Sequence, residues 1–492
     1  MVISLKKFYP YLYCLIISIL FIFIASKCSI LYQINDWVDA NAFFTVGKSM
    51  MRGIVPYQSL FEQKGPILYF IYGIGSLVSY KSFFGVFLLE IISFSFFLYY
   101  AYKILILYTK KENAYFIIPI LSLLVVSLKA FTHGGSAEEF SLPFLMYSFY
   151  KLILYLKEEN SSNISIKDLL INGLIAGIIL LIKYTLLGFW FGFMLIIIIR
   201  LIKDKKYQEV ILKSLIFLLG MIIACLPWLI YFGVNSAIKD FFDVYFLINI
   251  KLYPNKMPFI LKLKTTLSLI IQNLFGVSTY LFFIVGGFSL LFINKEKKLL
   301  YLVITLLTTA FFIYIGGTNY HYYSLIIAPF IIIGIISLLK TNINIEIKRY
   351  SIIICICLSL IGTYYLSNNA TMIKLKKENY AQYRFNEIIK QDKNPTLLNF
   401  GFLDGGFYTV SGILPNSYYF MKNNISYKNY PKMLDEQINY IKNKQVLYVV
   451  TKESATYRKY KNEIESNYLL IDQFTQKYQN KNVTYYLYRL GS

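Results

Sequence analysis

Two acidic residues that follow a long apolar run are the first sign of chemistry in this sequence. Asp36 and Asp39 stand just after the apolar run of residues 8–34, and they are three positions apart. A helix would present both carboxylates on one side, and either one could accept a proton as a general base. The alternative is that both favour the positive N-terminus of an interfacial helix that continues through Lys48.

The same loop, residues 35–66, carries a second pair of charges where it leads into the next apolar run. Glu62 and Lys64 precede Gly65-Pro66, a turn signal. A carboxylate suits a divalent metal ion and a lysine suits a phosphate. The alternative is a snorkelling pair that marks the membrane boundary.

Adjacent carboxylates interrupt a later apolar stretch at KAFTHGGSAEEFSLPF. An unpaired charge costs about 2.5 to 3.5 kcal/mol at the middle of a bilayer, so Glu138 and Glu139 are expected at an interface. His133 stands five residues earlier and could join them as a metal ligand. The alternative is a helix start capped by Ser136 before Phe140.

Further polar positions lie at the predicted ends of apolar runs. Lys183 separates two such runs, and a phosphate or the interface would satisfy its charge. His321 in NYHYY could bind phosphate, metal or sugar hydroxyls, and Tyr322 could stack on a sugar. An aromatic belt at the membrane surface has the same composition.

Composition places the chain in a membrane. Of its 492 residues 57% are hydrophobic and only 15% are charged, with a mean hydropathy of +0.54. The formal charge of +23 is spread over short loops and the C-terminal region, which favours membrane orientation and anionic lipid over nucleic acid. The five cysteines lie in apolar runs without metal-ligand spacing, so neither a disulfide framework nor a zinc site is expected.

The loop and its flanks resemble the GT-C membrane glycosyltransferases, which take sugars from polyprenyl-phosphate carriers. The matching pattern is an acidic residue in DANAFF, followed by GIVPYQSLFEQKGPILYFI, with weaker matches at SAEEFSLPF, LIKYTLLGF and NYHYYSLIIAPF. The resemblance extends from about residue 8 to residue 339. The region after residue 366 matches less clearly.

The resemblance implies roles for several of these residues. Asp39 takes the position of the family's base, and Glu138 takes the acidic position opposite it. In the lipid A aminoarabinose transferases, which the Glu62 segment resembles, the equivalent acidic residue belongs to the metal or phosphate site. A divalent cation, or Lys64 and Lys183 without one, would neutralise the leaving phosphate. The substrate-binding set then comprises Lys64, Lys183, His321, Tyr57 and Tyr322, and the metal set comprises Glu62, Glu139 and His133.

The expected fold is an all-α polytopic membrane protein of the GT-C type, with roughly 11 to 13 transmembrane or half-spanning helices in residues 1–366. Residues 367–492 turn polar, and strand-like TLLNF and QVLYVV alternate with a helix-like segment at 431–443. These features predict a small C-terminal extracytoplasmic α/β domain. Lys6 and Lys7 hold the N-terminus in the cytoplasm by the positive-inside rule, so loop 35–66 is expected on the outer face.

The expected function is transfer of a sugar from a polyprenyl-phosphate donor to a cell-envelope glycan, lipid or protein at the outer face of the cytoplasmic membrane. A divalent cation such as Mg or Mn would serve as cofactor, and no nucleotide or organic cofactor is expected. The expected partners are the donor, the acceptor and membrane lipid. One alternative is a multispan lipid or polysaccharide transporter, which would place its ionisable residues in mid-membrane. Another is a catalytically inactive scaffold of the same fold.

Overall fold

The chain folds into two compact units, each made of segments that are distant in sequence. The computed structural model describes residues 2–252, 258–340, 348–478 and 481–491. The first unit consists of residues 1–26, 89–227 and 255–370, and the second consists of residues 27–88, 228–254 and 371–492. Loop 35–66 therefore packs with the C-terminal region. This division follows packing, whereas the predicted boundary at residue 366 follows hydropathy.

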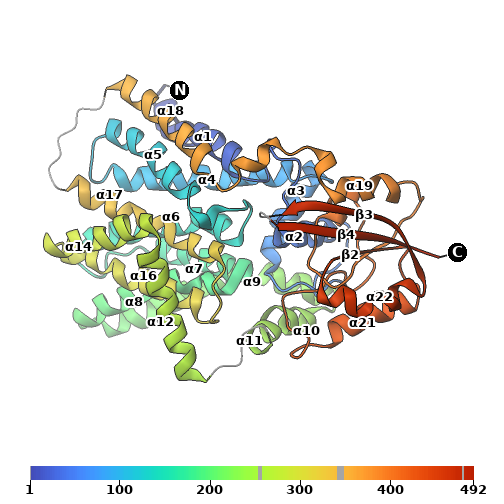
Figure 1. Cartoon of the computed structure of the whole chain (residues 1–492). Coiled ribbons are helices and arrows are strands. Elements are labelled where there is room, and N and C mark those ends of the chain that lie inside the picture. The colour runs from blue at the N-terminus through green and yellow to red at the C-terminus, as the bar shows by residue number, and fades with distance from the viewer. Residues whose placement is uncertain (1, 253–257, 341–347, 479–480, 492) are drawn as a thin grey trace. The chain divides into compact units, whose positions relative to one another are not determined.

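The first unit is helical throughout the part of the chain that the structure describes (Figure 1). Three helices cross the division between the units: α4 (Phe84–Leu105), α9 (Tyr207–Val234) and the short η6 (Ala370–Lys374). The other helices of the first unit are α1 (Val2–Ala25), α5 (Lys111–Val126), η1 (Lys129–Phe131), α6 (Ala137–Lys157), α7 (Ile166–Lys183), η2 (Tyr184–Leu187), α8 (Gly188–Lys203), α12 (Phe259–Gly276), α13 (Ser278–Tyr280), η4 (Leu281–Val285), α14 (Gly286–Ile293), α15 (Lys297–Leu300), α16 (Leu302–Tyr314), η5 (His321–Ile331), α17 (Ile332–Leu339) and α18 (Arg349–Leu366).

Long apolar helices confirm the predicted polytopic membrane protein. Among the described residues, seven helical stretches are long and apolar enough to cross a bilayer, and the bent pair of residues 259–276 and 278–293 makes eight if it counts as one span. The 13-residue helix α3 (Pro66–Val78) is apolar but shorter. Helices α7 and α8 are separated by η2 directly after Lys183, where the sequence predicted a break.

Large apolar side chains on the outside of these helices fit a bilayer. Only 17% of the apolar window is buried in α9, and the same fraction is buried in α18. Ile211, Leu215 and Leu219, for example, are all more than half exposed along α9. Such a row would be an aggregation site in water, but lipid acyl chains cover it in a membrane.

The second unit contains short helices and one sheet. Its helices are α2 (Val38–Met50), α3, α10 (Ile238–Phe241), η3 (Phe242–Ile248), α11 (Asn249–Lys251), η7 (Lys377–Asn379), α19 (Ala381–Ile389), α20 (Phe407–Ser411), α21 (Lys432–Lys442) and α22 (Ala455–Glu465). Its strands are β1 (Leu397–Asn399), β2 (Tyr448–Lys452), β3 (Tyr468–Tyr478) and β4 (Lys481–Leu490). The predicted α/β character of the C-terminal region is confirmed, because TLLNF contains β1, QVLYVV runs into β2, and residues 431–443 contain α21.

The four strands are hydrogen-bonded in the order β1-β2-β4-β3. Strand β1 pairs with β2 in parallel, with Leu397 opposite Tyr448, and β4 is antiparallel to both β2 and β3. Helix α21 lies between β1 and β2 in the sequence, as a parallel crossover requires. A bulge between Leu470 and Asp472 shifts the register of the long β3–β4 pair.

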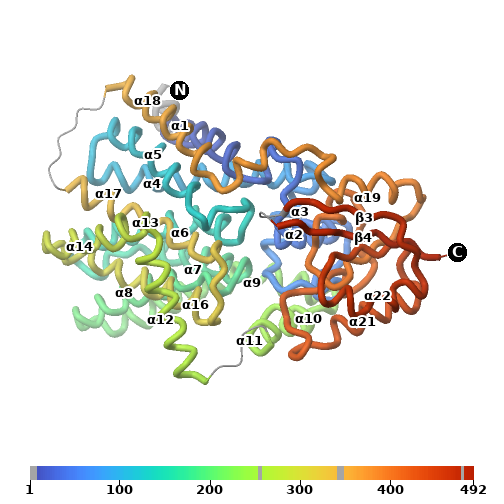
Figure 2. The backbone as a smooth tube through the Cα atoms, viewed as in Figure 1, coloured from blue at the N-terminus to red at the C-terminus, as the bar shows by residue number. Residues whose placement is uncertain are grey.

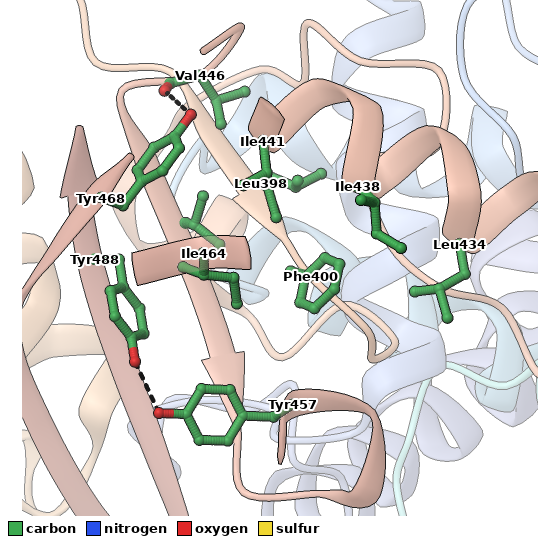
Figure 3. Close-up of a cluster of buried hydrophobic side chains, with 11 residues drawn as sticks. Leu398, Phe400, Leu434, Ile438, Ile441, Val446, Tyr457, Ile464, Tyr468 and Tyr488 are labelled. Carbon is green, nitrogen blue, oxygen red and sulfur yellow. Dashed lines mark hydrogen bonds between the residues drawn. The ribbon is translucent and has the colours of Figure 1, made fainter. Parts of the chain in front are cut away.

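One face of the sheet carries the core shown in Figure 3, in which strand residues meet the apolar sides of two helices. The core residues are Leu398, Phe400, Leu434, Ile438, Ile441, Val446, Val449, Tyr457, Ile464, Tyr468 and Tyr488. The hydroxyls of the buried tyrosines are hydrogen-bonded. The Tyr468 hydroxyl donates to the carbonyl of Val446 over 2.8 Å, and the hydroxyls of Tyr457 and Tyr488 lie 2.7 Å apart. Helices α21 and α22 thus close this face.

Helix α20 packs on the other face of the sheet and in turn contacts α2. Phe407 of α20 packs on Tyr485 of β4 with ring centroids 5.3 Å apart, and it stacks on Phe385 of α19. In Figure 2 the blue tube of α2 and α3 lies among the orange and red C-terminal segments, and hydrogen bonds between α2 and the segment around α20 confirm that contact. The sheet therefore supports α20, and α20 supports α2.

Candidate functional site

Polar side chains fix the start of α2, the helix that carries Asp39. The Asn35 side chain accepts a hydrogen bond from the backbone N–H of Trp37 over 3.0 Å. The Asn41 amide donates to the carbonyls of Asn35 and Trp37 over 2.8 and 2.9 Å. These contacts set the N-terminus of the helix at Val38 without a side-chain cap on Trp37.

Asp36 lies before α2 and is held in a buried ion pair. Its Oδ1 is 2.6 Å from Nζ of Lys27, and both side chains are less than 5% exposed. The expectation that Asp36 and Asp39 share one helix face is therefore wrong, because the helix begins after Asp36. Lys27 was not among the predicted site residues. A lysine at the end of an apolar span, nine residues before an aspartate, was the available signal.

Asp39 lies in the first turn of α2 and is half-buried. Hydrogen bonds to the C-terminal region hold its helix. Thr45 donates to Oδ2 of Asp404 over 2.6 Å, and Nζ of Lys48 donates to the carbonyl of Tyr408 over 2.9 Å. Asp404 and Lys48 are positioning residues that the sequence analysis did not single out.

The loop that presents Asp404 depends on glycine. Asp404 Oδ1 accepts the backbone N–H of Gly406 over 2.9 Å, and Gly406 has a φ of +90°. A Cβ at Gly406 would lie 3.0 Å from Oδ1 of Asn41, so a side chain there would meet α2. The glycines after β1 thus allow close packing against α2.

Burial shifts the pKa of both charged groups in this contact. Burial lowers the pKa of Lys48 to about 7, an effect that Asp404 opposes and Lys81 reinforces. Burial raises the pKa of Asp404, and hydrogen bonds from Thr45 and Gly406 work against that rise. Because burial causes both shifts, entry of water into this contact would return each pKa toward its ordinary value.

Three side chains lock the backbone of Lys64. The N–H of Lys64 donates over 2.8 Å to Oε2 of Glu62 and to the hydroxyl of Tyr69, which itself donates to Glu62. The hydroxyl of Tyr57 donates to the carbonyl of Lys64 over 2.6 Å. Tyr57 is fully buried, with φ at +68°, so its geometry positions Lys64 and leaves no surface for a sugar. Glu62 is likewise engaged with protein groups.

Lys64 extends toward the face of α2 that carries Asp39. Its Nζ lies 5.6 Å from the centroid of the Phe43 ring. Phe43 is four residues after Asp39, and side chains at i and i+4 share a helix face. The carboxylate predicted as base and the cation predicted to bind phosphate therefore lie on the same side of α2.

The first unit contains a second group of the predicted residues. Nζ of Lys183 at the end of α7 lies 2.6 Å from Oε1 of Glu138 in the first turn of α6, and both side chains are buried. The same ammonium lies 3.8 Å from the ring centroid of Tyr323 and 5.5 Å from that of Tyr322. His321 is exposed beside them at the start of η5. The structure thus brings together Glu138, Lys183 and Tyr322 from three separate segments.

Two buried polar atoms of the first unit lack hydrogen-bond partners among the described residues. These atoms are Oε2 of Glu138 and the hydroxyl of Tyr314. A buried polar group without a partner costs about 1 to 3 kcal/mol.

The remaining acidic candidate serves the start of α6. Ser136 caps the helix by accepting the N–H of Glu139 over 3.0 Å, as the alternative interpretation expected. Oε2 of Glu139 accepts the N–H of Gly135 over 2.8 Å. The buried carboxyl of Glu90, within the span α4, lies beside Glu139 and accepts from Ser26. Glu90 was missed, although a carboxylate inside an apolar run was its signal.

The predicted metal ligands do not gather into a metal centre in the part of the chain that the structure describes. No group of three or more His, Cys, Asp or Glu side chains is arranged there to hold an ion. Glu62 and Glu139 accept backbone N–H groups, and His133 is buried in the loop before α6. Glu62 belongs to the second unit, and Glu139 and His133 belong to the first.

The site residues are likewise divided between the units. Asp39, Glu62 and Lys64 belong to the second unit, and Glu138 and Lys183 belong to the first. Convergence of Asp39, Glu62 and Glu138 on one outer-leaflet cavity stays a prediction.

Comparisons with known proteins agree with this fold. The chain matches a crystal structure of ArnT from Cupriavidus metallidurans bound to undecaprenyl phosphate at a TM-score of 0.60 and 11% identity, over 96% of this chain and 97% of that chain. The apo structure of the same protein matches at a TM-score of 0.58 and 11% identity, over 99% and 98% of the two chains. These likenesses show that the chain shares the fold of ArnT. No curated protein matches the chain in sequence.

The sequence itself matches one family over most of its length. The family is described as "Putative competence-induced protein Ccs4 N-terminal domain", and the match covers residues 3–381. It therefore includes α2, the Lys64 turn and the Glu138–Lys183 pair. The chain belongs to this Ccs4 N-terminal domain family and shares the fold of ArnT.

Proposed function

We propose that this protein transfers a sugar from a polyprenyl-phosphate donor to a cell-envelope acceptor at the outer face of the cytoplasmic membrane. The carrying observation is that the ammonium of Lys64 lies 5.6 Å from the ring centroid of Phe43, which follows Asp39 by four residues on α2. Undecaprenyl phosphate in the similar ArnT structure supports a lipid-linked donor. The polytopic fold supports chemistry on a substrate that lies in the bilayer.

The proposed reaction forms one C–O bond and breaks another. Asp39 accepts the proton of the acceptor hydroxyl while its oxygen attacks the anomeric carbon of the donor. The bond between that carbon and the phosphate oxygen breaks, and polyprenyl phosphate leaves with the electron pair. Lys64 neutralises the charge that develops on the phosphate.

The locked backbone of Lys64 gives this residue a fixed position before substrate arrives. Glu62, Tyr69 and Tyr57 hold both its N–H and its carbonyl, so little order has to be gained on binding. Lys183 is the second cation proposed to act on the phosphate. A ligand there would exchange part of the Glu138 ion pair for its own contacts. The divalent cation expected from the sequence stays a prediction, and no step above depends on it.

The Asp39→Asn variant tests the reaction. We expect turnover to fall by a factor of about 10² to 10⁴, because the substitution removes the base and keeps the shape of the side chain. Binding of polyprenyl phosphate should be almost unchanged. The measurement is release of polyprenyl phosphate from lipid-linked sugars by the purified protein in nanodiscs, with lipid binding followed by native mass spectrometry.

Asp36→Asn is the matched control, since it removes the same charge three residues earlier. It leaves Lys27 buried without its partner, so we expect a lower melting temperature and near-normal turnover of the folded fraction. Near-normal turnover by Asp39→Asn would exclude Asp39 as the base. Loss of turnover in folded Asp36→Asn alone would place the base at Asp36.

A further inference from the structure

A cavity of about 220 Å³ lies within the second unit, apart from the Lys64 turn. Three segments form its walls: residues 27–35 after α1, residues 81–84 at the start of α4, and C-terminal residues of η7, α19 and α20. Its polar lining includes the side chains of Lys27, Lys81, Lys377, Gln33, Asn35 and Tyr383. None of these residues belongs to the reaction proposed above.

The charge on the lining is positive. Lys81 and Lys377 are exposed, and neither forms an ion pair with a described residue. Lys27 is neutralised by Asp36. No Asp or Glu side chain lines the cavity within the described part of the chain, although the exposed Glu378 is the neighbour of Lys377 in the sequence. An excess of two ammonium groups favours an anion, and lysine binds phosphate as a point charge.

Contacts between the lining residues hold the walls of the cavity together. The hydroxyl of Tyr383 donates to the carbonyl of Gln33, which ties α19 to the segment before α2. Nζ of Lys377 lies 5.4 Å from the Tyr383 ring centroid, and the Asn35 amide donates to Sγ of Cys28 over 3.3 Å. The cationic side chains therefore surround a shaped hollow and are not scattered over an open surface.

The volume limits the ligand. Pockets for drug-sized molecules usually measure about 300 to 1,000 Å³, so about 220 Å³ is too small for a complete lipid-linked sugar. A phosphate with a short polyol, such as glycerol phosphate, is of a suitable size. The half-buried side chain of Gln33 could hydrogen-bond to the hydroxyls of such a polyol.

We propose that this cavity binds a phosphate group carrying a substituent of about the size of glycerol, with Lys81 and Lys377 as its cationic contacts. Gln33 and Asn35 directly precede Asp36 and α2, so the ligand sits against the segment that positions Asp39. The site takes either the headgroup of an anionic phospholipid or a glycerol phosphate group in solution. The assignment is independent of the transfer reaction.

Binding to the full-length protein in phosphatidylcholine nanodiscs tests the proposal. Isothermal titration calorimetry with glycerol phosphate measures binding of the soluble ligand. Native mass spectrometry after incorporation of phosphatidylglycerol measures binding of the lipid headgroup. We expect the double variant Lys81→Ala/Lys377→Ala to bind at least about tenfold more weakly, because two charge-assisted contacts are lost. Raised salt should weaken binding to the wild-type protein.

The double variant Lys432→Ala/Lys442→Ala is the control, since it removes the same charge from exposed positions on α21. It should bind like the wild-type protein. Binding of only one probe, with loss in the Lys81/Lys377 variant, supports the site and identifies its source. Absence of binding by both probes, or equal binding by the two double variants, overturns the proposal. Neither readout needs turnover, so failure of the proposed reaction would not affect it.

Discussion

Replacement of Lys48 by methionine should change how stability depends on pH. Lys48 is fully buried in α2, where its ammonium donates to the carbonyl of Tyr408 and lies 4.8 Å from the ring centroid of Tyr80. Burial lowers its pKa from 10.5 to about 7 in the folded protein. Lys48→Met keeps most of the side-chain volume and removes the titrating group.

The sign and size of the effect follow from proton linkage. Between pH 7 and pH 10.5 the unfolded chain keeps the proton that folded Lys48 has released, so the unfolded state binds more protons. Stability of the wild-type protein therefore rises with pH across this window. Integration from pH 7 to pH 9 gives a gain of about 2 kcal/mol relative to Lys48→Met. The lost hydrogen bond to Tyr408 adds an offset that does not vary with pH.

Thermal unfolding of the two proteins in detergent at a series of pH values measures the effect. For a unit of 150 to 250 residues, about 2 kcal/mol corresponds to roughly 4 to 8 °C in melting temperature. Lys442→Met, at an exposed position, should show no such trend. A difference between wild type and Lys48→Met that stays constant from pH 7 to pH 9 would refute the burial argument.

Two further predictions test the buried Glu138–Lys183 ion pair and the close contact at Gly47. Glu138→Gln should lower the melting temperature by leaving Lys183 buried without its ion partner, at a cost of about 3 to 5 kcal/mol, and Lys183→Met in the same chain should restore part of the loss. An unchanged melt of Glu138→Gln would contradict the pairing. Gly47→Ala places a Cβ 2.4 Å from the carbonyl oxygen of Tyr69 on α3 and should cost about 1 to 3 kcal/mol in unfolding experiments. Gly276→Ala, with no atom within 4 Å of the new Cβ, should not destabilise, and equal melts for the two alanine variants would rule out the close contact.

Local composition determined the class of the protein and the position of most elements. Apolar runs long enough to cross a bilayer are visible in the sequence because each helix satisfies its own backbone hydrogen bonds. Strands β1 and β2 and helix α21 were predicted from short apolar patterns in residues 396–450. Strands β3 and β4 were not, because their pairing with one another and with β2 depends on the sheet that forms around them.

The sequence also named most charged residues of the site, because charge between apolar runs is expensive wherever the chain goes. Only the tertiary structure assigned their partners. In the folded chain Asp36 forms an ion pair with Lys27 and lies outside the helix that carries Asp39. Lys183 forms an ion pair with Glu138, which is 45 residues away in the sequence.

Asp404 was missed altogether, since it meets α2 only after a chain of 359 residues from Thr45 has folded back. Hydropathy and spacing describe what a side chain costs to bury, and both can be evaluated along the chain. Which opposite charge or hydroxyl offsets that cost depends on contacts between distant segments, and the fold alone creates those contacts.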